Sequence, residues 1–165
     1  MNRPIDTLQT FYHAFLALDA RKMSACYAAD ARFADPLMRV EGRDGIGSMW
    51  QMLCDAIVSN GRADWRLLVG ELQSEGERGR VHWEPKYRFG SDDQRVHNLI
   101  DSSFTFNEQG LIASQHDRYD LWRWSRQALG TRGTLLGWMP WFRARLRERA
   151  ARHLEAWMLA RRGGA

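Results

Sequence analysis

The strongest constraint on the fold is a two-residue hydrophobic repeat in the second half of the chain. Mostly apolar and mostly charged or polar positions alternate there, as in strands that bury one face. One row is Val81, Trp83, Pro85, Tyr87 and Phe89, and the next is Asn98, Ile100, Ser102, Phe104 and Phe106. Shorter alternation occurs at 65–70, and the turn "NEQG" leads into a further strand expected over 111–124. Pro85 cannot donate a ladder hydrogen bond, so the sequence predicts an edge or a bulge there.

Before residue 62 the apolar residues follow a helical period instead, apart from the short, extended "ARFADP" (31–36). Pro4 suits a first helical position, and apolar residues recur at helical spacing as far as Leu16. Further helices are expected over 20–28 and 45–59, with Asn60-Gly61 ending the last one. Helices followed by long strands predict an α+β fold. We expect a cone, in which a curved mixed or antiparallel sheet wraps round the N-terminal helices and leaves a small-molecule pocket at its mouth.

Composition limits the class of protein. The chain has 165 residues, 44% apolar and 27% charged, which is enough for one globular core. Its apolar runs are far shorter than the roughly 20 residues that span a bilayer, and the N-terminus does not resemble a signal peptide. The two cysteines form no CxxC, so we expect neither a disulfide scaffold nor a cysteine-based zinc site, and we expect a cytoplasmic location. The absence of HxH, HExxH, GxSxG and phosphate-loop motifs leads us to expect no metal and no cofactor.

Positive charge is concentrated at the C-terminal end. Residues 131–165 hold eight arginines against two glutamates, a net charge of +6, whereas the whole chain carries +4. We therefore expect no nucleic-acid-binding body, and we divide the chain into a domain at 3–127 and a basic amphipathic helical extension at 128–165. The apolar stripe of the extension is Phe142, Leu146, Ala150, Leu154, Trp157 and Met158. The stripe is expected to pack on the domain or on the partner of a homodimer; contact with an anionic membrane surface is the less favoured alternative.

Two segments resemble a known superfamily. "CYAADARFADPLMRVEGRDGI" (26–46) looks like the helix–strand–helix signature of the nuclear transport factor 2-like superfamily. "FTFNEQGLIASQHDRYD" (104–120) resembles the last hairpin and the "HRDYWD" ending of SnoaL-like members. The resemblance covers about residues 5–122, and it identifies the chain as a SnoaL-like member of this ketosteroid isomerase-like superfamily. It implies the cone fold, which hosts isomerases, cyclases, epoxide hydrolases, dehydratases and non-catalytic binders.

The resemblance makes Asp35 the first catalytic candidate. "YAADARFADP" is similar to the segment of ketosteroid isomerase that carries its general base, and Asp35 takes that position. Phe11 stands where that enzyme has its oxyanion-hole tyrosine, with Tyr12 beside it, and Ser102 aligns with its acid. Steroid isomerisation is therefore not expected. The alternative role of Asp35 is a structural carboxylate that binds backbone amides in a turn.

Asp117 is the second catalytic candidate. "QHDRYD" aligns with "HRDYWD", so Asp117 keeps the aspartate while Gln115 replaces the histidine. Gln115 cannot transfer protons, which removes a His–Asp dyad. Alternation places Gln115, Asp117 and Tyr119 on one face and His116 on the other. The alternative role of Asp117 is a strand-end carboxylate paired with an arginine.

The sequence thus predicts a small-molecule enzyme or binder with acid–base chemistry of the isomerase, cyclase or hydrolase type. Its ligand would be an apolar carbonyl or epoxide compound, with Asp35 as the base and Asp117 as its acidic or orienting partner. The alternative is a non-catalytic ligand- or protein-binding domain. Such a domain could associate with a membrane surface through its C-terminal helix. The expected ligand-binding residues are Tyr12, Trp50, Trp83, Asn98, Ser102, Gln115 and Tyr119.

Overall fold

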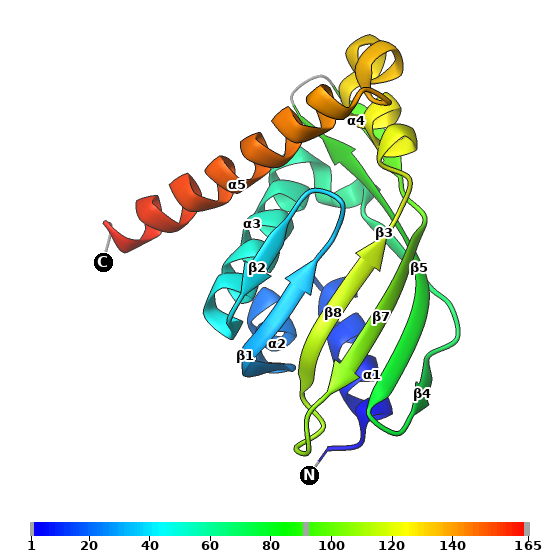
Figure 1. Cartoon of the computed structure of the whole chain (residues 1–165), viewed down its shortest axis with the longest axis vertical. Helices are drawn as coiled ribbons and strands as arrows, with labels where there is room; N and C mark the ends of the chain where they lie inside the picture. Colours follow the sequence, from blue (N-terminus) through cyan, green and yellow to red (C-terminus); the bar gives the residue numbers. More distant parts are fainter. Residues whose placement is uncertain (1, 91–92, 164–165) are drawn as a thin grey trace.

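Three helices form the first part of the computed structural model, which describes residues 2–90 and 93–163 (Figure 1). They are α1 (Pro4–Leu16), α2 (Ala20–Ala25) and α3 (Arg43–Gly61), and a short 3-10 turn, η1 (Arg62–Asp64), follows α3. The helix expected over 20–28 is shorter than predicted because Tyr27 already begins a strand and pairs with Ile112. Asp19 caps α2 by accepting a hydrogen bond from the Lys22 amide.

The strands form one mixed sheet. They are β1 (Tyr27–Ala34), β2 (Arg39–Glu41), β3 (Arg66–Val69), β4 (Gln73–Glu75), β5 (Arg78–Phe89), β6 (Gln94–His97), β7 (Ile100–Phe106) and β8 (Ile112–Arg118). The sheet order is β2-β1-β8-β7-β5-β3, with β4 and β6 also paired to β5. The β1–β8 pair is parallel and the other pairs are antiparallel. The expected α+β cone, a strongly curved sheet round helices, is therefore confirmed.

Pro85 marks the place where β5 changes partner. Trp83 is the last residue of β5 that pairs with β7, and Lys86 is the first that pairs with β6. The Asn98 amide donates to the Pro85 carbonyl oxygen at 3.1 Å across the change. Pro85 also pairs with Leu67 of β3, so the structure shows a change of partner strand where the sequence predicted an edge or a bulge.

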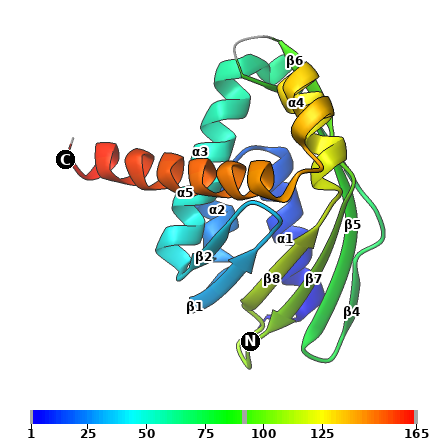
Figure 2. The ribbon, with the colours of Figure 1, turned by 45° about the horizontal axis from the view of Figure 1, so that its top comes forward.

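Aromatic side chains fill the cone between the sheet and the helices. Figure 2 shows α1 and α3 within the curl of the sheet. The Phe15 ring of α1 lies 5.0 Å from Trp50 of α3 and 5.5 Å from Trp83 of β5, measured between ring centroids. The row from Ile100 to Phe106 is buried at every second residue, as the alternation predicts. The interior is thus a packed core, and polar groups within it need partners.

The C-terminal extension consists of α4 (Leu121–Leu136) and α5 (Pro140–Arg162). The strand expected over 111–124 was too long: β8 ends at Arg118, and Asp120 starts α4 by accepting hydrogen bonds from the Trp122 and Arg123 amides. The expected boundary at 128 falls inside α4, shortly before Gly130. The last two residues of the expected extension, 164–165, lie outside the described residues.

The stripe of α5 faces the domain. Leu154 is buried in the main core, and Trp157 and Met158 pack against it. Leu146 packs on a second, smaller core formed by Val96, Leu121, Trp124 and Ala128. Arg147 ties α5 to the β1–β2 loop by donating from Nε to the Pro36 carbonyl oxygen at 2.9 Å. Among the described residues, no helix is long and apolar enough to cross a bilayer.

Candidate functional site

A chain of hydrogen-bonded polar side chains runs through the core of the cone. We call it the buried network; its members are Trp50, Tyr27, Gln115, Asp117, Ser102 and Trp83. Trp50 Nε1 donates to the Tyr27 hydroxyl at 3.0 Å, and that hydroxyl donates to Gln115 Oε1 at 2.5 Å. Gln115 Nε2 donates in turn to Asp117, at 2.9 Å to Oδ1 and 3.1 Å to Oδ2.

Ser102 completes the network from the other side. Trp83 Nε1 donates to the Ser102 hydroxyl at 2.7 Å, and Ser102 donates to Asp117 Oδ1 at 2.5 Å. The register explains these contacts, because Ser102 lies directly opposite Asp117 in the β7–β8 ladder and opposite Val81 in the β5–β7 ladder. Asp117 is therefore the carboxylate on which the network converges.

The proton affinity of Asp117 is strongly raised. Its side chain is 3% exposed. Burial raises the pKa of Asp117 from 3.8 to about 7; hydrogen bonds from Ser102 and Gln115 lower it in part, and the charge of Asp35 raises it further. Near neutral pH this group exists as both carboxylic acid and carboxylate, so it can donate a hydrogen bond as well as accept one.

Tyr12 provides a second polar group at the same place. Its hydroxyl is buried beside Ser102, which lowers its pKa, and it makes no well-formed hydrogen bond with the described residues. Burial raises the pKa of Tyr12 well above its ordinary value, and the Asp117 charge adds to this, so the phenol stays protonated. A protonated phenol and a carboxylic acid side by side can donate two hydrogen bonds to one oxygen atom.

Asp35 lies at the end of β1, where it organises a turn. Its Oδ1 accepts hydrogen bonds from the Leu37 and Met38 amides, both at 2.6 Å. Burial raises the pKa of Asp35, while the Met38 amide, the Leu37 amide, the Tyr119 hydroxyl and the nearby His116 lower it, in that order. The turn contacts agree with the structural role considered for Asp35.

The two carboxylates lie close enough to influence each other. The charge of Asp35 raises the pKa of Asp117, and Tyr119 is affected by both. In the part of the chain that the structure describes, neither carboxylate forms an ion pair. The arginine pairing considered for Asp117 is therefore absent from this structure, within the described residues.

Most of the residues predicted to form the site are buried. Those that are buried are Tyr12, Trp50, Trp83, Asn98, Ser102, Gln115 and Asp117, whereas Asp35 and Tyr119 are half-buried. His116 is exposed on the outer face, as alternation requires. Asn98 lies between β6 and β7, where its Oδ1 accepts a hydrogen bond from the Leu99 amide at 3.1 Å.

Sequence reasoning missed Tyr27. It is fully buried and joins Trp50 to Gln115. The expected helix over 20–28 included Tyr27, and the real strand has a register shift between Tyr27 and Arg32 that breaks the alternation. Only the pairing of β1 with β8 brings Tyr27 to Gln115, and no local signal reports that pairing.

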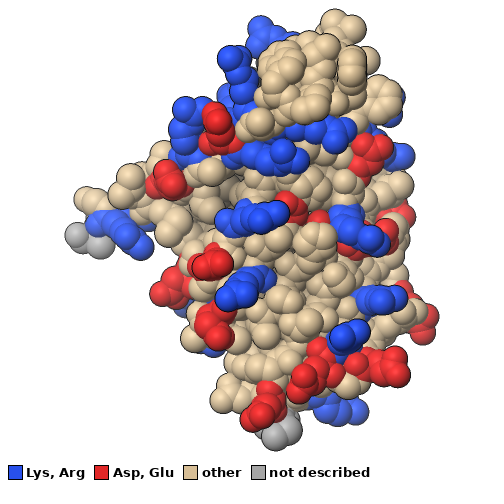
Figure 3. Space-filling model, viewed as in Figure 1, with Lys and Arg blue, Asp and Glu red and all other residues tan. Residues whose placement is uncertain are grey.

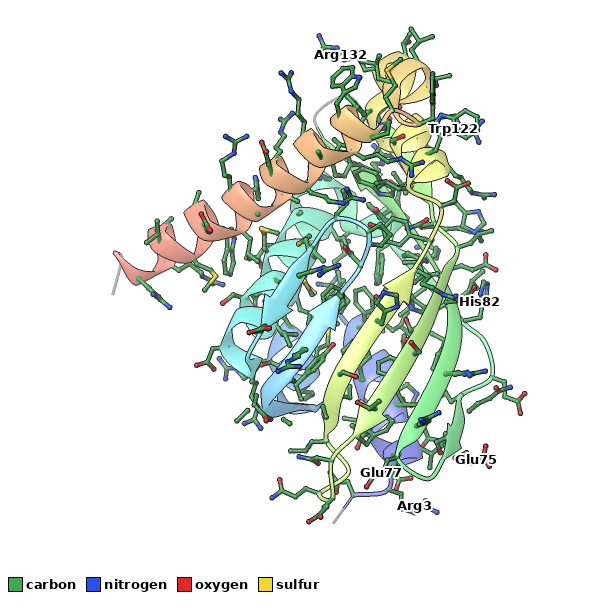
Figure 4. All side chains as sticks on the ribbon, in the orientation of Figure 1. Arg3, Glu75, Glu77, His82, Trp122 and Arg132 are labelled. Atoms are coloured by element: carbon green, nitrogen blue, oxygen red, sulfur yellow. The ribbon has the colours of Figure 1, made fainter. Side chains whose placement is uncertain are left out.

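A hollow of about 660 Å³ lies on the opposite, outward face of the sheet. Its lining includes Arg80, His82, Asp101 and His116. Figure 4 shows His82 at this outer face, where its Nδ1 lies 2.8 Å from Asp101 Oδ1. Among the described residues, no group of three or more His, Cys, Asp or Glu side chains is arranged to hold a metal ion.

Comparisons with known proteins place this geometry among related folds. The family model of the SnoaL-like domain matches residues 8–115. A search of curated proteins found no match. A ketosteroid isomerase-like protein from Catenulispora acidiphila, solved with trimethylamine, has a TM-score of 0.64 at 13% identity, over 77% of this chain and 94% of the other.

Two further structures carry enzyme descriptions. The epoxide hydrolase/cyclase-like enzyme SalBIII, linked to pyran ring formation in salinomycin, has a TM-score of 0.61 at 15% identity, over 72% of this chain and 91% of its own. An epoxide hydrolase from M. tuberculosis has a TM-score of 0.61 at 17% identity, over 83% of this chain and 96% of its own. Identities this low establish a shared fold and leave the reaction of this chain open.

Proposed function

Because the chain belongs to the SnoaL-like domain family, we propose that it is an enzyme acting on an apolar carbonyl- or epoxide-bearing small molecule. In this proposal the ligand oxygen is bound by the Tyr12 hydroxyl and by Asp117 in its protonated form, and Asp35 accepts a proton. One observation carries the proposal: the buried Tyr12 hydroxyl, which makes no well-formed hydrogen bond with the described residues, lies beside a carboxyl group whose pKa is about 7. A ligand oxygen would satisfy both groups.

The network determines where the acidic proton of Asp117 sits. Oδ1 already accepts hydrogen bonds from Ser102 at 2.5 Å and Gln115 at 2.9 Å. The proton therefore resides on Oδ2, whose one bond is the longer one from Gln115 at 3.1 Å. A donor fixed in this way stabilises negative charge that develops on a ligand oxygen without reorganising during the reaction.

Asp35 is suited to accept the proton. Two amides hold its Oδ1 and so fix the carboxylate, and in the proposal its second oxygen takes a proton from carbon next to a carbonyl. The electrons of the broken C–H bond move to the carbonyl oxygen and form an enolate bound by Tyr12 and Asp117. The pKa of Asp35, raised by burial, strengthens it as a base.

In this proposal a ligand enters beside the extension. The loop that follows Asp35 is covered by α5 through the Arg147–Pro36 hydrogen bond, and Leu37 and Leu146 both pack on the second core. A ligand can reach a filled interior only if side chains move, so this proposal requires the contact between α5 and the loop to open. Arg147→Ala should therefore increase the rate of ligand entry.

The proton-transfer half of the proposal is tested with apolar ketones in D₂O. Proton NMR follows the exchange of hydrogens next to the carbonyl, and a parallel panel of apolar epoxides is followed for ring opening. Asp35→Asn should abolish exchange, and Tyr12→Phe and Asp117→Asn should each reduce it about 100-fold, the scale of one lost oxyanion donor. Asp30→Asn, at an exposed carboxylate of β1, is the matched control and should exchange like the wild type.

The second candidate is a non-catalytic ligand-binding domain. The closed hydrogen bonds of the buried network and the turn contacts of Asp35 favour it, because both carboxylates already have partners. This alternative predicts binding of the same apolar ligands without exchange or ring opening. Equal affinity in the wild type and in Asp35→Asn, together with no turnover, would decide for it.

A further inference from the structure

Four large apolar side chains are exposed at the junction of α4 and α5. Trp122 is 36% exposed, Trp141 51%, Trp138 58% and Leu135 62%. We call these four residues the α4–α5 corner. In Figure 3 an uncharged surface at the top of the molecule is bordered by basic residues, and Figure 4 labels Trp122 and Arg132 at the same end. Single exposed apolar residues are ordinary, whereas a cluster of this size marks an interaction site.

The backbone holds the corner in place. Gly130 has φ +57° and breaks α4, so the chain folds back on itself. A Cβ on Gly133 would lie 1.8 Å from the Ser125 carbonyl oxygen, and one on Gly137 would lie 2.1 Å from Ser125 Oγ. Trp122 Nε1 donates to the Thr134 carbonyl oxygen at 3.3 Å across the fold. The apolar side chains are therefore presented by a tightly packed turn.

Positive charge surrounds the corner. Residues 121–147 contain six arginines and no aspartate or glutamate. Arg126 lies 4.5 Å from the centre of the Trp122 ring, and Arg145 lies 5.7 Å from that of Trp141. Each guanidinium thus sits over an exposed indole, and the apolar tip and its charge form one surface.

We propose that the α4–α5 corner docks on the surface of a membrane rich in anionic lipids. Indole and leucine side chains suit the boundary between headgroups and acyl chains, and arginines suit the lipid phosphates. The apolar stripe of α5 is not available for this contact, because Leu154 is buried in the main core. Docking therefore uses the tip of the extension, in contrast to a helix lying flat on the membrane.

Charge argues for this partner over two others. A second copy of the chain that met the corner through its own corner would bring the same arginine-rich segment against it, so like charges would oppose a dimer there. Nucleic acid would pair with the arginines but would offer no apolar partner for Leu135, the most exposed side chain of the corner. An anionic bilayer satisfies both the charge and the apolar tip.

Sedimentation of the full chain with vesicles tests the proposal. One vesicle is phosphatidylcholine alone, and the other is phosphatidylcholine mixed with phosphatidylglycerol. The chain should bind the mixed vesicles at least about tenfold more strongly, and added salt should weaken this binding. Trp138→Ser/Trp141→Ser should lose about tenfold in affinity without a change in melting temperature. Arg132→Gln/Arg145→Gln should lose affinity for the mixed vesicles only.

The control is Leu159→Ser, which removes a side chain that is 67% exposed near the far end of α5. It should bind like the wild type. The proposal is overturned if the chain does not bind the mixed vesicles, or if Trp138→Ser/Trp141→Ser binds them as well as the wild type does. It is also overturned if the wild type is a dimer and this double variant is a monomer. The same holds if the variant loses affinity for double-stranded DNA and neither protein binds the vesicles.

Discussion

The buried network and the α4–α5 corner depart from ordinary protein organisation in opposite directions. In the network a carboxylate, an amide and hydroxyls lie inside an aromatic core. At the corner three tryptophans and a leucine lie outside, among arginines. Buried polar groups and exposed apolar clusters are the two arrangements that the hydrophobic effect alone does not produce.

Each arrangement has a cost that the rest of the fold offsets. The network removes Asp117 from water, which is why the pKa of this group rises to about 7. The corner leaves apolar surface in water, held there by a turn in which Ser125 leaves no room for side chains at Gly133 and Gly137. Packing explains the rest of the core, whereas the buried network and the α4–α5 corner need a functional explanation.

The largest expected effect comes from deleting residues 140–165. Leu154, Trp157 and Met158 would lose their packing, and burial of a large side chain contributes about 1.5–3 kcal/mol. The free energy of unfolding should fall by about 5 kcal/mol, and the exposed core surface should promote aggregation. Thermal melts and light scattering measure both. An unchanged melting temperature would show that the extension is independent of the domain.

The second effect concerns pH and the buried network. The folded chain holds the Asp117 proton up to pH about 7, whereas the unfolded chain releases it near 3.8. The folded state therefore binds more protons between these values, so the contribution of Asp117 to stability falls as pH rises through this window and is level above it. The difference amounts to roughly 4 kcal/mol.

Asp117→Asn should remove this dependence. Denaturant unfolding at pH 4 and pH 8 should show a smaller loss of stability with pH than in the wild type, and the variant should be at least as stable as the wild type at pH 8. Asp30→Asn, at an exposed carboxylate, should keep the wild-type dependence. A variant that loses stability equally at both pH values would mean that Asp117 is ionised in the folded chain.

A matched pair of leucines separates the two faces of α5. Leu154 is 8% exposed and Leu159 67%. Leu154→Ala should lower the free energy of unfolding by about 2–3 kcal/mol, and Leu159→Ala by less than about 0.5 kcal/mol. Equal effects in thermal melts would contradict the packing of α5 on the domain.

The smallest effect distinguishes the turn role of Asp35 from its proposed chemistry. Asp35→Ala removes the acceptor for the Leu37 and Met38 amides and should cost about 1–2 kcal/mol. Asp35→Asn keeps an acceptor oxygen, so its stability should stay within about 0.5 kcal/mol of the wild type. If both variants melt like the wild type, the turn does not depend on this side chain.

Periodicity predicted the parts of the site that depend on local pattern. The two-residue repeat placed Ser102, Gln115 and Asp117 on the inner face and His116 on the outer face. This works because one step along a strand reverses the direction of a side chain. The helical period likewise predicted the helix over 45–59, on which Trp50 is buried.

The rest depends on contacts between segments that are distant in the chain. The pKa of Asp117 is set by how α1 and the sheet exclude water, and the position of Tyr27 depends on a register shift in β1. The end of β8 was predicted too late because the two-residue alternation continues past Arg118. The cap that Asp120 provides for α4 ends the strand earlier. The exposed corner could not be predicted, because it depends on the chain reversal at Gly130. The sequence around Gly130 has a helical pattern that gives no sign of this reversal.

The parallel pairing of β1 with β8 has a consequence for biosynthesis. Tyr27 pairs with Ile112, and Phe33 with Gln115, so β1 lacks its inner neighbour until most of the chain has left the ribosome. Until then the hydroxyl of Tyr27 also lacks its acceptor on Gln115. A nascent chain released before β8 is made cannot close the sheet, and the long-range pairing makes closure slow compared with that of a helical bundle. The extension is synthesised after β8, so α5 docks on a domain for which all strands of the sheet have already been made.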